Sequence, residues 1–340
     1  MDFTLDPAAA AVEEAADEVV RRLEPDWETR FDGSGFDDTA WRAFLDAGFP
    51  AMPLPGAVGG DDLDVDSLRP LVTRAGRDAV VTPLLGTLAA GLTVREDLGA
   101  VAVAIGEPGS ALGDPQATTA TSEAPGVLVT GVKTGVLHAD AAEHLLVTTD
   151  AGVAVVAADA DGVRITRTTS SSGWGECTVR FDGARADRVL DDSTSGDPVT
   201  RLVDVYRALL AAYASGLLAG AIARTAEHVS TRNQFGKPIA AFQAVGQQLA
   251  DVYVVSATLD LVAVTAAWEL AQGRDAAVDL GTALYTVASE LPATMRTMTH
   301  LHGGIGVDVT YPLHRYFSLA KDLARLVGGS DRTLEVLACS

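Results

Sequence analysis

The chain has 340 residues, of which 48% are hydrophobic, and a formal net charge of −21. This length and apolar content allow two or three domains around substantial cores. The acidic balance argues against a nucleic-acid or anionic-membrane surface, because such surfaces neutralise phosphates with clustered Lys and Arg. It does not exclude a phosphate-bearing ligand, which needs only one or two well-placed cations.

Neither a targeting signal nor a membrane span is expected from the sequence. The first twenty residues carry six acidic groups and no basic one, unlike a secretory signal. No run of eighteen uninterrupted apolar residues occurs, which is about the length that a membrane helix needs. The two cysteines, Cys177 and Cys339, form neither a disulfide framework nor a zinc site. We therefore expect a cytoplasmic protein without a structural metal.

Residues 1–97 are predicted to be helical. Residues 8–23 are rich in Ala, Glu and Val at helical spacing. Asp37 and Asp38 are candidate N-caps for a helix that includes Trp41 and Phe44. Gly59-Gly60 interrupts this region, and residues 65–79 resume the helical pattern.

Residues 98–196 change to short β-type segments bounded by turns. The predicted strands are 101–105, 126–130, 143–148, 153–156 and 177–181. Because no helical pattern separates these short strands, we predict an antiparallel sandwich or barrel. The turn-rich residues 191–198 mark the end of this region.

Residues 197–340 return to long helices, predicted at 200–231, 239–272, 275–299 and 312–326, with a short one at 330–338. Long apolar or amphipathic helices with short connections predict a four-helix bundle. The fold class is therefore α+β, with domains at residues 1–97, 98–196 and 197–340.

Two segments of the last domain have the features of a ligand site. Arg232 ends a long helix, and Gly236-Lys237-Pro238 forces a break just after it. Unpaired backbone groups beside a guanidinium suit a diphosphate, although an arginine that stabilises the helix macrodipole explains the spacing equally well. The second segment is His300-Leu-His302-Gly303-Gly304-Ile-Gly306, where three positions without side chains let a ligand approach the backbone.

Together these segments resemble the C-terminal domain of the acyl-CoA dehydrogenases. The resemblance rests on Arg232-x-Gln-Phe235-Gly236-Lys-Pro-Ile-x-x-Phe-Gln243, His302-Gly-Gly-Ile-Gly306 and Tyr311-Pro-Leu-His-Arg-Tyr316. Residues 41–49 with Gly59-Gly60 are similar to that family's first domain. Residues 106–109 and 131–133 are similar to its middle β-domain. The resemblance therefore covers nearly the whole chain.

The resemblance implies an FAD at a subunit interface, with its ring held by one subunit and its ADP half by the other. A glutamate of the family removes the α-proton of an acyl-CoA thioester while the β-hydrogen leaves to the flavin. In this chain the positions that match the ADP grip are Arg232, Phe235, Gly236, Gln243, His302, Gly303, Gly304 and Gly306. His300 stands where many members have Gln, and it can still make a hydrogen bond.

The positions that match the ring site and the catalytic base depart from the family pattern. The first Thr and last Ser of Thr-Glu-Pro-x-x-Gly-Ser are Gly106 and Leu112 here, and Val136 and Leu137 lack an expected aromatic ring and hydroxyl. Removing a buried hydrogen bond to the flavin costs roughly 1 kcal/mol or more. The family's base loop corresponds to residues 326–330, which contain no glutamate, and the alternative base position is Tyr206. We assign no catalytic residue to the chain.

Two further features concern the substrate. Asp204 and Arg207 match a region where family members contact the CoA-bearing substrate, although their i,i+3 spacing favours an ordinary ion pair on a helix surface. The connection at residues 92–99 is shorter than in the family, whose extra residues help to wall the acyl pocket. Its shortness is compatible with a bulky acyl group.

These departures resemble the non-catalytic subunits of the α2β2 acyl-CoA dehydrogenases of actinobacterial steroid side-chain degradation. We therefore expect a subunit that supplies ADP-half contacts, a homologous partner that supplies the glutamate, and a CoA thioester of a cholesterol side-chain remnant as substrate. One alternative is a self-sufficient homo-oligomer with an unrecognised base such as Tyr206 or His302, although a tyrosine pKa near 10 makes a poor base. The other is a scaffold that has lost FAD.

Overall fold

The computed structural model describes residues 6–25, 27, 33–110, 112–123, 126–191 and 196–339. They group into two compact units. Residues 31–68 and 81–209 form one, called the β-unit below, and residues 1–30, 69–80 and 210–340 form the helical unit. The three domains expected from the sequence, at residues 1–97, 98–196 and 197–340, stay a prediction.

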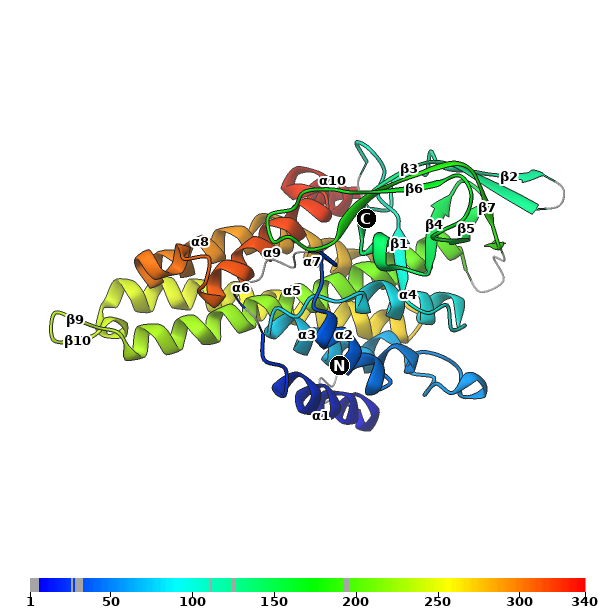
Figure 1. Ribbon diagram of the computed structural model, residues 1–340. Helices are drawn as coiled ribbons and strands as arrows, with labels where there is room; N and C mark the ends of the chain where they lie inside the picture. Colours follow the sequence, from blue (N-terminus) through cyan, green and yellow to red (C-terminus); the bar gives the residue numbers. More distant parts are fainter. Residues whose placement is uncertain are drawn as a thin grey trace. The chain divides into compact units, whose positions relative to one another are not determined.

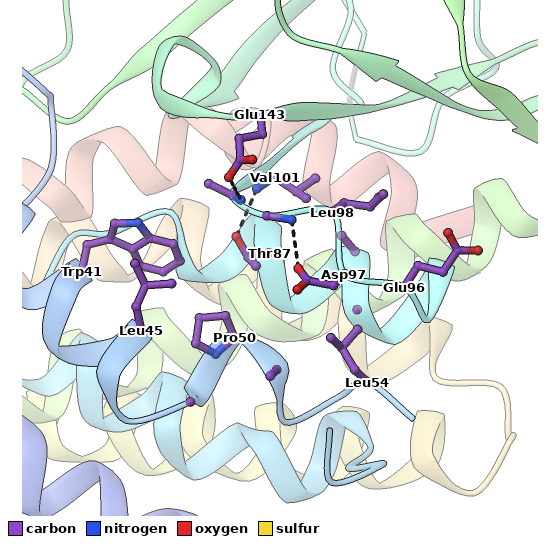
Figure 2. Close-up of a pocket in the computed structure, with 16 residues that line it drawn as sticks. Trp41, Leu45, Pro50, Leu54, Thr87, Glu96, Asp97, Leu98, Val101 and Glu143 are labelled. Carbon is purple, nitrogen blue, oxygen red and sulfur yellow. Dashed lines mark hydrogen bonds between the residues drawn. The ribbon is translucent and has the colours of Figure 1, made fainter. Parts of the chain in front are cut away.

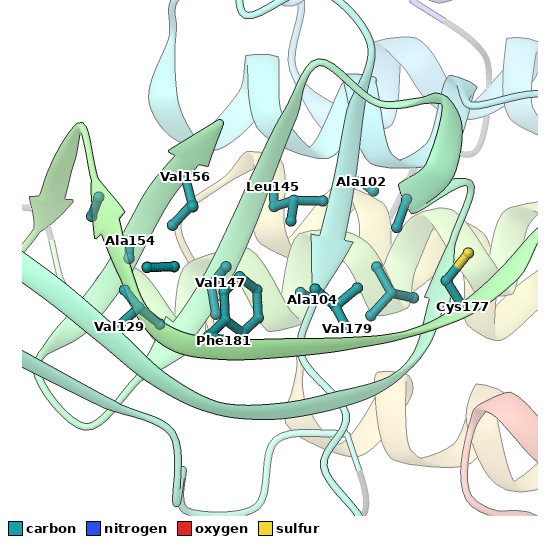
Figure 3. Close-up of a cluster of buried hydrophobic side chains, with 14 residues drawn as sticks. Ala102, Ala104, Val129, Leu145, Val147, Ala154, Val156, Cys177, Val179 and Phe181 are labelled. Atoms are coloured by element: carbon teal, nitrogen blue, oxygen red, sulfur yellow. The ribbon is translucent and has the colours of Figure 1, made fainter. Parts of the chain in front are cut away.

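The β-unit contains two four-stranded sheets (Figure 1). The first has the order β1 (Val101–Ala104), β4 (His144–Thr149), β5 (Gly152–Ala157) and β8 (Arg188–Leu190). The second has the order β2 (Thr119–Glu123), β3 (Gly126–Leu137), β7 (Glu176–Ala186) and β6 (Val163–Arg167). Apolar side chains from both sheets form one buried cluster, in which Val147 of β4 and Phe181 of β7 are typical members (Figure 3). This shared core makes the pair of sheets a sandwich.

The predicted antiparallel sandwich is found, with the exception of one pair of strands. β1 and β4 run parallel, with Val101 opposite His144. Parallel neighbours need a crossover connection. Here the connection leaves the sheet and forms β2 and β3 of the other sheet before it returns. Strands β2 and β6 were not predicted, because most of their side chains are exposed and no apolar alternation marks them.

Short helices complete the β-unit: α2 (Asp38–Asp46), η1 (Phe49–Ala51), η2 (Gly56–Val58) and α4 (Leu84–Val94). Of the two predicted N-caps, Asp37 is the one used, since its side chain accepts a hydrogen bond from the Ala40 amide at 2.9 Å. α4 is largely apolar and buried. The N-terminal ends of α3 (Val65–Arg77) and α5 (Pro198–Thr231) also belong to this unit.

The helical unit contains α1 (Pro7–Arg21), the remaining parts of α3 and α5, α6 (Gln243–Ala271), α7 (Ala277–Ser289), α8 (Leu291–His302), α9 (Pro312–Leu326) and α10 (Gly329–Cys339). α5 and α6 are joined by the hairpin β9–β10 (Figure 1). They contact each other where Ser215 donates a hydrogen bond to Asp260 at 3.0 Å. The predicted helix 275–299 is two helices, because Pro292 lacks the amide hydrogen that a continuous helix needs and therefore sits in the first turn of α8.

Two helices are long and apolar enough to span a membrane by length and composition alone. The most apolar window of α5 is 83% buried, as in a core helix, whereas that of α6 is only 22% buried. The absence of a membrane span therefore stays a prediction from the sequence. Most of the apolar window of α6 is therefore exposed in the chain alone.

Candidate functional site

The first predicted segment forms a tight hairpin after α5. Strands β9 (Asn233–Gln234) and β10 (Lys237–Pro238) flank Phe235 and Gly236, whose φ angles are 52° and 80°. Two positive φ values at the centre of a two-residue turn identify a type I′ hairpin. Gly236 adopts this conformation freely, whereas Phe235 does so at a steric cost. The side chain of Phe235 is 92% exposed, so an apolar ring is held out from the protein on a strained backbone.

Arg232 lies at the base of this hairpin. Residues 232–238 are called the Arg232 hairpin below. Its amide donates to the carbonyl of His228 at 2.9 Å, and its carbonyl accepts from the amide of Ile239 at the same distance. Its side chain is exposed, and its guanidinium has no ion pair with the described residues. Gln243, another predicted contact, begins α6 and is also exposed. Both side chains are therefore available to a ligand.

The second predicted segment begins where α8 ends. Gly303 has a φ of 66° and caps the helix, and Gly304 follows in the short helix η6 (Gly303–Val307). A Cβ on Gly303 or Gly304 would meet no atom within 4 Å, so the backbone of this Gly303-Gly304 turn is open. Gly306 differs, because its Cβ would lie 2.6 Å from the carbonyl oxygen of Thr299. The first two glycines permit close approach from outside, and the third permits internal packing.

A stacked pair of histidines links the two segments. The rings of His228, one turn before Arg232, and His302, just before Gly303, lie 4.3 Å apart at 22°. Nδ1 of His302 donates to the carbonyl of Met298 at 2.9 Å, and burial lowers the pKa of His302 despite this bond. The His302 ring is therefore neutral at pH 7. Sequence reasoning missed His228, although its i,i+4 spacing from Arg232 places both on one helix face.

The other predicted residue, His300, is exposed on the last turn of α8. The structure thus brings Arg232, His302, Gly303 and Gly304 into one region of the helical unit through the histidine pair. The side chains of His300, Phe235 and Gln243 are exposed, and no hydrogen bond or ring contact among the described residues joins them to this region.

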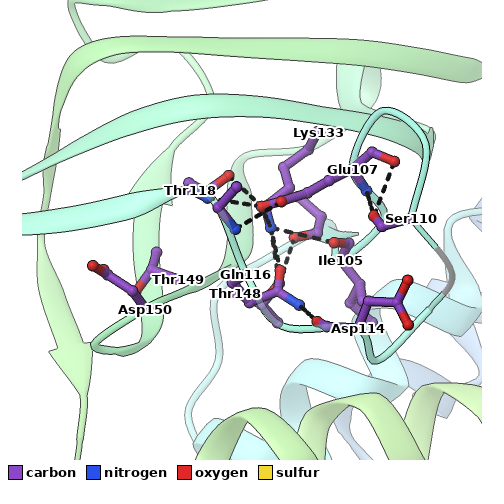
Figure 4. Close-up of polar contacts among 12 residues, drawn as sticks. Ile105, Glu107, Ser110, Asp114, Gln116, Thr118, Lys133, Thr148, Thr149 and Asp150 are labelled. Atoms are coloured by element: carbon purple, nitrogen blue, oxygen red, sulfur yellow. Dashed lines mark hydrogen bonds and ion pairs between the residues drawn. The ribbon is translucent and has the colours of Figure 1, made fainter.

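A buried ion pair organises the loop after β1 in the β-unit (Figure 4). Nζ of Lys133 is 2.7 Å from the carboxylate of Glu107 and also donates to Gln116, Thr148 and the Ile105 carbonyl. Burial works to raise the pKa of Glu107, but hydrogen bonds from Lys133, Thr118 and Ala117 outweigh it and lower the pKa to about 2. Burial lowers the pKa of Lys133 to about 8. Glu107 and Lys133 thus serve the loop's architecture.

Asp204 and Arg207 pair with each other at 3.5 Å on α5, as their spacing predicts. Neither is an ordinary surface residue, because their side chains are only 24% and 15% exposed. The Arg207 guanidinium also donates to the carbonyl of Leu112. Contact with a substrate stays a prediction for both residues, and the bond to Leu112 is a role that the sequence did not indicate.

The structure offers no base at the two positions that the sequence identified. In the described residues 326–330, Val327 is buried and Gly328 and Gly329 form a turn with φ of 106° and 78°. None of these residues carries a carboxylate. Tyr206 is only 3% exposed, and burial, reinforced by Glu176, raises the pKa of its hydroxyl. A buried phenol with a raised pKa does not accept a proton at neutral pH.

The short connection after α4 borders a cavity of about 200 Å³ within the β-unit (Figure 2). Its apolar wall includes Trp41, Leu45 and Leu54. Its polar rim is already paired, since the Ala100 amide donates to Glu143 at 3.2 Å and the Gly99 amide donates to Asp97 at 3.0 Å. Pockets for drug-sized ligands measure about 300–1,000 Å³. This cavity alone is therefore too small for a fused ring system.

Comparison with known proteins identifies the family. Residues 198–338 match the model of the acyl-CoA dehydrogenase C-terminal domain. Acyl-CoA dehydrogenase FadE28 of Mycobacterium tuberculosis is 42% identical over 317 residues, which cover 88% of this chain and 91% of that protein. The chain belongs to the acyl-CoA dehydrogenase family. FadE27 of the same organism is 32% identical over 98% of this chain and 97% of its own length.

Two solved structures resemble this chain over nearly its whole length. The ChsE4–ChsE5 complex from Mycobacterium tuberculosis contains a chain with a TM-score of 0.88 and 28% identity, covering 100% of this chain and 98% of that one. A steroid ACAD variant of Tcur3481–Tcur3483 gives a TM-score of 0.88 and 29% identity, with 97% and 96% covered. The acyl-CoA dehydrogenase fold expected from the sequence is therefore confirmed.

Proposed function

We propose that this chain is the non-catalytic subunit of an FAD-dependent acyl-CoA dehydrogenase that introduces an α,β-double bond into a CoA thioester. The contrast between two regions carries the proposal. The Arg232 hairpin and the Gly303-Gly304 turn present a guanidinium and open backbone. Residues 326–330 contain no carboxylate, and Tyr206 is buried. In this proposal the chain binds part of the dinucleotide and supplies no base for removal of the α-proton.

Each residue proposed to contact the ADP half of FAD has a distinct role. Arg232 binds the diphosphate through charge-assisted hydrogen bonds, and the Gly303-Gly304 turn lets the ligand reach the backbone. Gln243 hydrogen-bonds the ADP half, while His228 and His302 hold the two segments in register through their stacked rings. FAD, when bound, accepts the hydride that leaves the β-carbon of the thioester. The α-proton goes to a glutamate of the partner subunit.

The surface of α6 supports a partner subunit. Tyr253, Val254 and Leu261 on this helix are 67%, 62% and 52% exposed. The helix contains no Lys or Arg, and its only charged residues are Asp251, Asp260 and Glu269. Exposed apolar patches of this kind mark interaction sites. Since a chain similar to this one occurs in the ChsE4–ChsE5 complex, we propose that α6 packs on a homologous catalytic subunit in an α2β2 assembly.

The substrate class is proposed as the CoA thioester of a steroid side chain. The support is the similarity to the steroid ACAD Tcur3481–Tcur3483 and the short connection between α4 and β1. Because the cavity at that connection holds only about 200 Å³, we place no steroid ring in it. The partner's acyl pocket is the expected place for the ring system.

The test is to purify the chain alone and together with a candidate catalytic subunit of the same fold. Flavin absorbance should give one FAD for every two protomers in the complex. Anaerobic addition of a steroid side-chain CoA thioester should bleach the flavin of the complex and leave the chain alone inactive. A chain that, alone, reduces its own FAD with the thioester at an ordinary rate would overturn the proposal.

A further inference from the structure

The loop between β1 and β2 carries positions that match the family's flavin-ring site. Gly106 and Leu112 are the positions at which the sequence departs from the family's ring-binding pattern. Leu112 is only 6% exposed, and its Cδ2 lies 3.8 Å from where a Cβ on Gly106 would stand. The leucine side chain therefore packs beside the position from which a threonine side chain is missing. At the two positions where the family pattern has hydroxyl side chains, this chain has a glycine and a leucine that lie next to each other.

Arg207 closes this loop from α5. Its guanidinium donates to the Leu112 carbonyl, and a Cβ on the following Gly113 would lie 2.5 Å from Nη2 of Arg207. Gly113 has a φ of 97°, so glycine is needed there both for the backbone conformation and for the approach of the arginine. Asp204 holds the guanidinium from the other side at 3.5 Å. The arginine is thereby fixed on the loop.

The ends of the same loop are fixed by Glu107. Its carboxylate accepts hydrogen bonds from the amides of Ala117 and Thr118 at 2.8 and 2.9 Å and from the Thr118 hydroxyl at 2.6 Å (Figure 4). The Glu107 amide and carbonyl are both bonded to Ser110. The amides of Ala117 and Thr118 and the Thr118 hydroxyl are therefore already hydrogen-bonded within the loop. Because Gly106 and Leu112 offer no side-chain hydrogen bond, the loop lacks two polar contacts of the family's ring-binding pattern.

We propose that Leu112 and Arg207 form a clamp that closes this chain's own flavin-ring site. The inference rests on the proposed function and deepens it, because it gives a structural reason for one FAD per two protomers. The chain then contributes to a cofactor only through its Arg232 hairpin and Gly303-Gly304 turn. Arg207 acts here as a positioning residue for the loop.

A thiol-accessibility experiment on the two-subunit complex tests the clamp. Leu112→Cys is introduced in a Cys339→Ser background. The remaining Cys177 is fully buried, and burial raises the pKa of its thiol to about 11, so it reacts slowly. Maleimide labelling of the introduced thiol should be slow and unchanged by saturating FAD. Adding Arg207→Ala should increase the labelling rate at least ten-fold, because the clamp on the loop is then absent.

The matched control is Arg201→Ala. Arg201 is on the same helix and donates to the Leu92 carbonyl in the last turn of α4 at 2.9 Å, so its substitution removes a similar bond away from the β1–β2 loop and should leave labelling unchanged. Labelling that FAD slows in the otherwise unchanged chain, or that Arg207→Ala leaves unaltered, overturns the clamp. Failure of the proposed function has a different signature. In that case Arg232→Ala leaves the FAD content of the complex unchanged, whether or not Arg207→Ala changes the labelling rate of the introduced thiol.

Discussion

Glu107 and Lys133 form an ion pair with almost no access to water, at 8% and 0% side-chain exposure. Removing one charge leaves the other buried without a partner, which costs about 3–5 kcal/mol. We therefore expect Glu107→Gln to lower the free energy of unfolding by about that amount in urea titrations. Glu96→Gln is the control, because its pair with Arg188 is exposed and should change stability by less than about 1 kcal/mol. Equal effects of both substitutions would contradict a special role for the buried pair.

The same pair predicts an acid-dependent loss of stability. The pKa of Glu107 is about 2 in the folded protein, below its ordinary value of 4.5. A depressed carboxylate pKa stabilises the fold fully above the unfolded value, and this contribution is lost as pH falls from 4.5 toward 2. Unfolding free energies measured between pH 5 and 3 should fall less steeply for Glu107→Gln than for the unchanged chain. Parallel slopes would show that another carboxylate is responsible.

Arg232 allows a test of cofactor binding that does not disturb the fold. Its side chain is exposed, so Arg232→Ala should leave thermal stability unchanged. A hydrogen bond to a charged group is worth about 1.5–3 kcal/mol, which corresponds to roughly 10–100-fold in affinity. The FAD dissociation constant of the two-subunit complex, measured by flavin fluorescence, should rise by that factor. Arg274→Ala, which removes an arginine stacked on Trp268 at the other end of α6, should leave the constant unchanged.

At the scale of elements, three glycines allow α3 and α5 to cross with their backbones in contact. A Cβ on Gly216 would overlap the Thr73 carbonyl, and one on Gly220 would overlap the Arg77 carbonyl. Gly76 has the same relation to Tyr213. Since backbone atoms cannot yield as a flexible side chain does, Gly216→Ala should destabilise the helical unit by about 1–3 kcal/mol. A melting temperature that stays constant would contradict this packing.

Gly246→Ala is the matched control for that substitution. Gly246 lies in α6, and a Cβ there would meet no atom within 4 Å. Alanine has the better helix propensity, so this change should raise the free energy of unfolding by about 0.5–1 kcal/mol. The same replacement in two helices is therefore expected to have opposite signs.

The sequence predicted helices better than strands, for a physical reason. α2 and its Asp37 cap depend on residues close together in the chain, and both were predicted. Pro292 is likewise a local signal, although one continuous helix was predicted across it. β2 and the parallel pairing of β1 with β4 depend on neighbours distant in sequence, so local periodicity carries no sign of them. The same holds for the site: Arg232 stands in a recognisable motif, whereas the bond from Arg207 to Leu112 joins residues 95 positions apart.

For the whole molecule, the unequal burial of α5 and α6 bears on assembly. Both helices are apolar, but the apolar window of α6 is only 22% buried within this chain. A net charge of −21 keeps separate copies apart in solution, since like charges repel. A partner that covers α6 in the proposed assembly therefore has to offer complementary shape and apolar surface.

Leu261→Glu tests this partner surface. Leu261 is 52% exposed, so the substitution should leave the chain's own melting temperature nearly unchanged. In the proposed assembly the carboxylate would be buried without a partner, which strongly disfavours association. Light scattering after size exclusion should show the complex dissociating at concentrations at least ten-fold higher than for the unchanged chain. Val58→Glu, at a residue 56% exposed in the β-unit, is the control and should assemble normally. A Leu261→Glu chain that assembles as tightly as this control would move the interface away from α6.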